Sequence, residues 1–163
     1  MDFDSGAALR EWALNLERAM NTTIGVDDSG AFALHTKGGA PVVMEPVPGQ
    51  HAAILSAGLG TVDDSTPRRV LQALLAANLQ PGVVGPSVLG VQPQDGTVTL
   101  RLIWTPNDEG WRYESFVDVL SAFGQQVDTL AASIASREIE RLLPDDAAPG
   151  APDSTSYGNP QFA

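Results

Sequence analysis

The chain has 163 residues, no cysteine, and 20 acidic against 9 basic side chains, which gives a formal charge of −11 at pH 7. The lack of cysteine excludes disulfides, thiol nucleophiles and thiolate metal sites, and the negative charge removes the usual attraction to nucleic-acid phosphates, so we expect no nucleic-acid partner. No apolar run approaches the ~18 residues of a membrane span and no secretory segment is recognisable, so we expect a cytoplasmic protein without membrane insertion.

The N-terminal third predicts an amphipathic helix followed by three short strands. Apolar residues from Leu9 to Met20 recur with helical spacing and form one stripe. Three apolar stretches follow, separated by turns rich in glycine and proline, at residues 31–36, 41–46 and 52–57. Because no helix separates these strands, we expect them to pair in antiparallel fashion.

The middle of the chain predicts a second helix and a β-hairpin. Pro67 suits the first turn of a helix, which runs to about Asn78 with leucines on one side and alanines on the other. After a segment rich in glycine and proline, two apolar runs are joined by residues 92–96, in which Asp95-Gly96 is a strong hairpin signal. Alternation in the second run predicts one set of side chains on a single face of the sheet: Val98, Leu100, Leu102 and Trp104.

The C-terminal part predicts one long helix and a disordered tail. Tyr113 to Leu143 carries an apolar seam with helical spacing, and Pro144 ends it. Residues 144–163 are rich in Pro, Gly, Ser and Asp and have little to bury. We therefore expect a folded domain at 1–143 of the α+β class, with a twisted antiparallel sheet of about five strands and three helices in the order α-β-β-β-α-β-β-α.

The sequence predicts no catalytic or metal site. His35 and His51 are isolated, and no sequence motif groups a nucleophile, a base and an oxyanion donor. The acidic run that begins at Asp27 resembles the start of a calcium loop but lacks the glutamate at its twelfth position. We therefore expect no enzymatic activity and no cofactor.

Two stretches carry a resemblance to a known family. LLAANL (Leu74 to Leu79) is followed by the Gly/Pro segment and then by LGVQPQDGTVTLRLI (Leu89 to Ile103). With the amphipathic first helix and the seamed last helix, this pattern resembles the Tir-chaperone (CesT-like) family, the class I chaperones of bacterial type III secretion. The resemblance covers roughly residues 5–143, and the chain departs from the family pattern at Pro106 to Trp111 and in its polar tail.

The resemblance implies a cytoplasmic bacterial homodimer that binds the N-terminal chaperone-binding segment of a secreted effector. Such a chaperone keeps the segment soluble and secretion-competent without ATP. The family places the second helix and the adjoining hairpin at the dimer interface, so the candidate interface residues are Leu71, Leu74, Leu75 and Leu100. Weak alternation in the first three strands suggests apolar residues on both faces, and the candidate effector-binding residues there are Phe32, Leu34, Val43 and Ile54.

Two alternatives stay open on sequence grounds. One is a small-molecule-binding or hydrolytic domain, which would need a pocket where His35 or His51 meets a carboxylate. The other is a regulatory adaptor of the same fold. For each of the four effector-binding candidates, a place in the hydrophobic core is an equally good interpretation.

Overall fold

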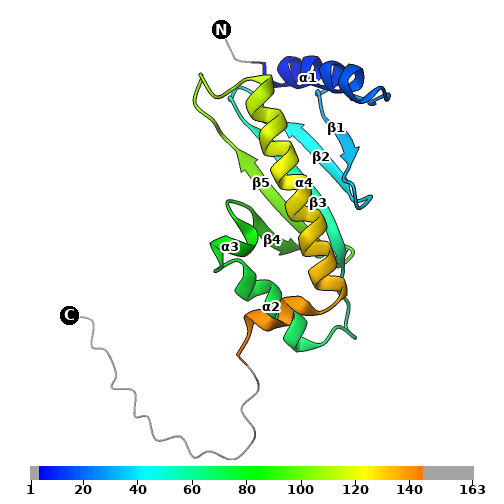
Figure 1. Ribbon diagram of the computed structural model, residues 1–163, viewed down its shortest axis with the longest axis vertical. Helices are drawn as coiled ribbons and strands as arrows, with labels where there is room; N and C mark the ends of the chain where they lie inside the picture. Colours follow the sequence, from blue (N-terminus) through cyan, green and yellow to red (C-terminus); the bar gives the residue numbers. More distant parts are fainter. Residues whose placement is uncertain (1–3, 145–163) are drawn as a thin grey trace, which may run out of the picture.

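The computed structural model describes residues 4–144, in which helices cover one face of a five-stranded antiparallel sheet (Figure 1). The predicted α+β class and strand count are confirmed. Beside the three predicted helices there is a fourth, very short one in the Gly/Pro segment, and the predicted tail after Pro144 lies outside the described residues. In chain order the elements are α1 (Ser5–Met20), β1 (Phe32–His35), β2 (Pro41–Pro46), β3 (Ala53–Thr61), α2 (Arg68–Ala77), α3 (Pro81–Val84), β4 (Val88–Val91), β5 (Thr97–Trp104), α4 (Tyr113–Ala135) and the 3-10 helix η1 (Glu138–Leu142).

The strands lie in the order β1-β2-β3-β5-β4, and every neighbouring pair is antiparallel. β3 accompanies β5 along its whole length, from Thr61 opposite Thr97 to Ala53 opposite Trp104. β4 is shorter and pairs with β5 only between Val98 and Arg101. The last part of β5 therefore extends beyond β4, with a neighbouring strand on one side only.

The core lies between the sheet and the helices. In Figure 1, α4 crosses the sheet from end to end, with α1 at one end of the molecule and α2 with η1 at the other. The predicted alternation of β5 is confirmed, because Val98, Leu100 and Leu102 are buried whereas Ile103 is 58% exposed. The other face of the sheet has no helix over it among the described residues.

The last helix is shorter than predicted. α4 ends at Ala135, Arg137 adopts a left-handed conformation with φ of 62°, and η1 turns back to pack against α2. The seam ends because the next positions with its spacing carry charges, at Glu138 and Arg141, whereas the reversal lets Ile139 bury all but 2% of its surface.

No helix within residues 4–144 combines the length and the apolar character required to cross a bilayer.

Candidate functional site

Three apolar grooves open on the helical side of the sheet. The first, which we call the α2–β4 groove, has a volume of about 190 Å³ and lies where α2 faces the hairpin. Two of its lining residues are large, apolar and exposed, since Leu75 is 71% exposed and Val91 46%. Leu79, just after the end of α2, is 81% exposed. Among the predicted dimer residues, Leu71 and Leu74 also line this groove. Leu100 on β5 is fully buried, with its side chain in the core between the sheet and the helices, so this side chain is not available to a second copy.

A side-chain amide closes the free edge of β4 beside this groove. The Asn78 Nδ2 donates to the Leu89 carbonyl at 3.0 Å, and the Leu89 N–H donates to the Asn78 Oδ1 at 2.8 Å. β4 is the last strand of the sheet, so these two backbone groups have no strand to pair with on that side. Asn78 thus replaces a neighbouring strand at one residue, which protects an edge that would otherwise invite pairing.

The second groove, the β1-edge groove, has a volume of about 360 Å³ and lies between β1 and α4. Its apolar lining includes Met20, Leu34, Val42 and Leu120. Asp128 on α4 holds the turn after β1, because its carboxylate accepts hydrogen bonds from the Thr36 hydroxyl and from the Gly38 N–H.

Gly38 is required for that contact. A Cβ at this position would lie 2.5 Å from a carboxylate oxygen of Asp128, so a larger residue would displace the carboxylate. His35 lines the same groove, but no hydrogen bond joins it to Asp128, whose two oxygens already serve the turn. His35 and Asp128 thus line the same groove, but no hydrogen bond pairs them as an enzyme would require.

The four predicted effector-binding residues do not share one surface. Phe32 is only 3% exposed and its ring meets that of Phe116 with a centroid separation of 6.3 Å, so it belongs to the core. Leu34 lies half-buried in the β1-edge groove. Val43 and half-buried Ile54 lie on the opposite, uncovered face, where Ile54 pairs with the exposed Ile103.

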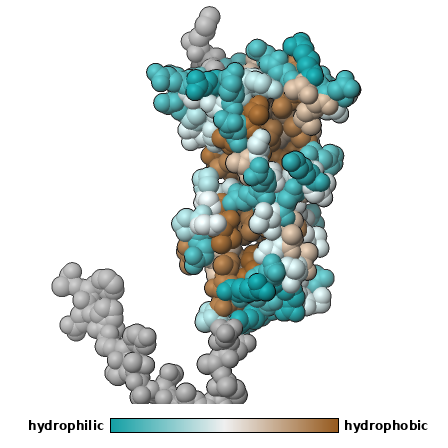
Figure 2. All heavy atoms as spheres, in the orientation of Figure 1, coloured by the Kyte–Doolittle hydropathy of each residue, from teal (hydrophilic) through white to brown (hydrophobic). Residues whose placement is uncertain are grey.

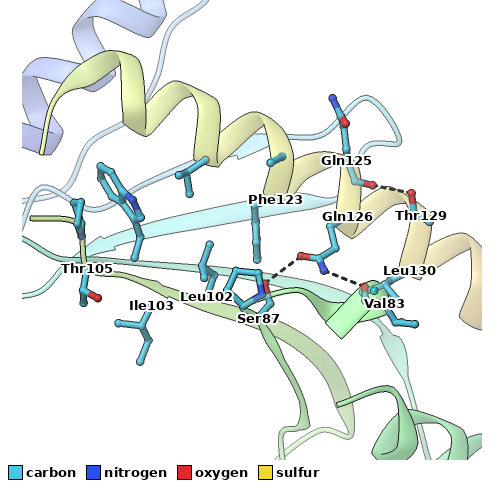
Figure 3. A pocket seen from close by; sticks show the side chains of 16 residues that line it. Val83, Ser87, Leu102, Ile103, Thr105, Phe123, Gln125, Gln126, Thr129 and Leu130 are labelled. Atoms are coloured by element: carbon cyan, nitrogen blue, oxygen red, sulfur yellow. Dashed lines mark hydrogen bonds between the residues drawn. The ribbon is translucent and has the colours of Figure 1, made fainter. Parts of the chain in front are cut away.

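The third groove, the β5-edge groove, is the largest, with a volume of about 640 Å³ (Figure 3). It lies between α4, α3 and the part of β5 that extends beyond β4, and none of its lining residues is charged. Figure 2 shows apolar atoms open to solvent on this face, between more polar surfaces at the two ends of the molecule.

Gln126 fixes the lower end of the β5-edge groove. Its Nε2 donates to the Val83 carbonyl at 3.0 Å, and its Oε1 accepts from the Ser87 hydroxyl at 3.1 Å (Figure 3). These bonds join α4 to α3 and to the residue that precedes β4, so the Gly/Pro segment is held away from the end of β5. Sequence reasoning missed this groove, because neither Gln126 nor the short helix α3 belongs to a recognisable motif.

An aromatic cluster adjoins the same groove. The ring of Trp12 on α1 lies 4.9 Å from Trp111 and 5.0 Å from Phe116, and Trp104 stacks on Trp111 at 5.1 Å. The cluster joins α1, β5 and the start of α4. Trp104 also lines the β5-edge groove.

The described residues show no catalytic constellation. His51 Nδ1 lies 2.8 Å from a carboxylate oxygen of Asp108, but the Asp108 side chain is 89% exposed and neither residue lines any of the three grooves. Within residues 4–144 no three His, Asp or Glu side chains come together in a way that could hold a metal ion.

The comparisons with known proteins point to one family. The model of the Tir chaperone protein (CesT) family matches residues 13–130, from α1 to α4. The chain is similar in structure to one in the ExsC–ExsE complex, with 16% identity and a TM-score of 0.60 over 90% of this chain and 100% of that chain. The chain is also similar in structure to one in the HopA1–SchA chaperone–effector complex. Here the identity is 15% and the TM-score 0.58, over 78% of this chain and 94% of that chain.

A third similar structure is the Yersinia pestis type III secretion chaperone SycH in complex with a fragment of YscM2. Here the identity is 15% and the TM-score 0.52, over 75% of this chain and 98% of that chain. Identities this low establish a shared fold and nothing finer. Among curated protein sequences no significant match was found.

Proposed function

This chain belongs to the Tir chaperone protein (CesT) family, and we propose that it acts as a type III secretion chaperone in the bacterial cytoplasm. It binds the N-terminal segment of a secreted effector and keeps that segment soluble and secretion-competent without ATP. The observation that carries the proposal is the family match, which includes all five strands, α2, α3 and most of α4.

The physical character of the grooves supports this proposal. Three apolar grooves lie on a single small chain whose net charge is −11. A soluble monomer rarely leaves so much apolar surface open unless a partner covers it. An unfolded segment gains affinity by burying apolar side chains in several separate grooves, which offsets the entropy lost when the segment becomes ordered.

We assign the α2–β4 groove to a second copy of the chain. Leu75 and Leu79 are the most exposed large apolar residues in the described structure. Leu75 lines the groove, and Leu79 follows two residues after the end of α2. Leu75→Asp should convert a dimer to a monomer in light scattering, whereas Gln72→Asp, also exposed on α2, should leave the dimer intact. A soluble and stable monomer for the unmutated chain would contradict this assignment.

We assign effector contacts to Leu34 in the β1-edge groove and to Val43 and Ile54 on the uncovered face. Phe32 is left out because it is buried against Phe116. Leu34→Asp should weaken effector binding more than Val43→Asp, because only Leu34 lies within a groove that an apolar side chain can fill.

The test of the proposed function is co-purification. The full chain is co-expressed with the N-terminal region of each larger protein encoded beside it, and the captured partner is identified. The expected result is a stable complex with at least one such region, resistant to washing in the presence or absence of ATP. If none of these regions binds, the proposed function fails, and an adaptor or small-molecule-binding role becomes the better interpretation.

A further inference from the structure

The uncovered face of the sheet carries little charge on a strongly acidic chain. The side chains that alternate with the core residues of the five strands point to this face. With histidine counted as neutral, only Glu45 and Arg101 among them carry a charge, although the whole chain has 20 acidic and 9 basic residues. A partner that approaches this face therefore avoids most of the negative charge that repels acidic groups elsewhere on the molecule.

Arg101 on β5 supplies the positive charge of that face. The ladders place Ser56 of β3 opposite it on one side and Val88 of β4 on the other. Thr99 and Ile103 precede and follow it on the same face of β5. Val88 is 57% exposed and Ile103 58%, and the side chain of Arg101 is exposed as well. The guanidinium thus lies among uncharged neighbours, two of which are large, apolar and open to solvent.

No group in the described part of the chain uses this charge. Within residues 4–144 the Arg101 guanidinium takes part in no hydrogen bond and no ion pair. The Arg137 guanidinium, by contrast, donates to both carboxylate oxygens of Glu140, at 2.7 and 2.9 Å. Glu45 lies on β2, two strands away from Arg101 and in the neighbouring row of residues. Arg101 therefore presents a fork of N–H donors that is open to a carboxylate from outside.

The choice of occupant follows from charge and position. A carboxylate matches the guanidinium because two parallel N–H···O bonds join the two groups. A second copy stacked on this face about a two-fold axis near Arg101 would instead bring two guanidinium groups together, which is unfavourable. The effector contacts assigned above to Val43 and Ile54 lie on the same face, and Ile54 pairs with Ile103 next to Arg101. The effector is therefore the partner whose path reaches Arg101.

We propose that Arg101 selects the bound effector by pairing with one of its carboxylates, while apolar groups of the effector contact Ile103 and Val88. The inference rests on the proposed function and names the charge chemistry of the effector segment on the uncovered face. The apolar contacts on both sides shield the ion pair from water, which makes it stronger than a freely exposed pair. A basic residue at the same place would face the guanidinium without compensation, so Arg101 also rejects segments that carry one there.

The first experiment uses three peptides that differ in one residue. The full chain, labelled with ¹⁵N, is titrated with millimolar Ac-Ser-Val-Glu-Ile-Ser-NH₂ and with the same peptide carrying Gln or Lys in place of Glu. The Glu peptide should give a saturable shift of the Arg101 side-chain Nε–H and of the Val88 and Ile103 amides. The Gln peptide should bind about threefold more weakly, and the Lys peptide more weakly still. Raising the NaCl concentration from about 50 to about 500 mM should remove the advantage of Glu over Gln, because salt screens charges at the surface.

Variants of the chain decide whether the guanidinium sets this preference. Arg101→Gln should bind the Glu and Gln peptides equally well. Arg101→Glu should reverse the order, so that the Lys peptide binds about threefold more tightly than the Glu peptide. Arg18→Glu, at an exposed position on α1, changes the net charge by the same amount and should keep the preference for Glu. Both positions are exposed, so the fold should be retained, and a merely structural role of Arg101 would not reverse the order.

The outcomes separate this inference from the proposed function. Shifts that are absent, confined to the grooves, or independent of the charge of the peptide would overturn the inference, as would a preference for Glu that survives in Arg101→Glu. A change of oligomeric state in Arg101→Glu without peptide contact at Val88 and Ile103 would assign the face to a second copy instead. An effector captured equally well by Arg101→Glu and by the unmutated chain would also overturn the inference, whereas the proposed function would stand. A reversed preference with no effector captured would leave the Arg101 site in place and count against the secretion role alone.

Discussion

The free edge of β4 and the end of β5 that extends beyond β4 both have a backbone N–H and C=O without a neighbouring strand. The two edges differ in whether a side chain bonds to these groups. At Leu89 the Asn78 amide forms two hydrogen bonds with the strand, so that edge is closed. At Ile103, two strand residues past the last β4 pair, no group within residues 4–144 plays that part, and a groove of about 640 Å³ lies alongside. A chain that protects one edge with a dedicated side chain and leaves the other open beside an apolar cavity marks the second edge as a place for a partner.

The largest expected effect comes from moving a proline by one residue along β5. Leu102→Pro should destabilise the fold by about 3 kcal/mol or more, since it removes a hydrogen bond to β3 inside the sheet. Ile103→Pro should cost about 1 kcal/mol, because its N–H lies on the open edge. Urea unfolding of both variants measures the difference. Equal losses would show that the two residues do not face opposite edges.

Removing the side chain that closes β4 should have the next largest effect. Asn78→Ala leaves the Leu89 N–H and C=O without their partner and should lower the free energy of unfolding by about 2 kcal/mol. Asn78→Asp can still accept from Leu89 and should lie between Asn78→Ala and the unmutated chain. Gln80→Ala, nearby and exposed, serves as the control in the same denaturant titration. An Asn78→Ala chain as stable as that control would refute the closing role.

Loosening the lower end of the β5-edge groove should cost somewhat less. Gln126→Ala removes two hydrogen bonds and leaves the buried Ser87 hydroxyl without its partner, for a loss of about 1 kcal/mol. Gln125→Ala, on the same helix but exposed, is the matched control. Hydrogen exchange should show faster exchange in α3 and at Ser87 only in the Gln126 variant. If both variants behave alike, Gln126 does not hold the groove.

The smallest effect concerns the hairpin turn at residues 92–96, which joins β4 to β5. Hydrogen bonds from Thr97, above all from its backbone N–H, hold the pKa of the Asp95 carboxyl below its ordinary value of 3.8. A depressed pKa stabilises the fold at neutral pH, and this contribution disappears as the pH falls through the folded-state pKa. In Asp95→Asn, thermal stability should change less on acidification below pH ~4 than in the unmutated chain. Identical pH profiles would show that this bond contributes nothing.

The sequence predicted the sheet better than it predicted the surfaces. Alternation in β5 placed Leu102 inside and Ile103 outside, because period-two patterning directly reports which face is buried. β1 has only four residues, too few for its pattern to separate a core residue such as Phe32 from a groove residue such as Leu34. The open edge depends on where β4 begins, at Val88. The preceding residue, Ser87, bonds to Gln126 on α4, and this contact across the fold leaves no local pattern in the sequence.

The dimer candidates illustrate the same limit. Leu71, Leu74 and Leu75 all lie on α2, yet Leu74 is only 5% exposed whereas Leu75 is 71% exposed. The difference arises because the helix packs on η1 as well as on the sheet. The turn into η1 depends on a left-handed Arg137, which no local pattern of charges or apolar residues specified. Helical periodicity therefore located α2 and α4 but could not say which of their sides would stay open.

The aromatic cluster gives this protein a built-in optical reporter. Its three tryptophans, Trp12, Trp104 and Trp111, all lie in that one cluster, with centroid separations of 4.9 to 6.1 Å. At such distances excitation passes readily between the indoles, so the emission of the whole chain reports one place. Trp104 lines the β5-edge groove. Whatever enters that groove should therefore shift the intrinsic fluorescence without any added dye, and its arrival can be followed in real time.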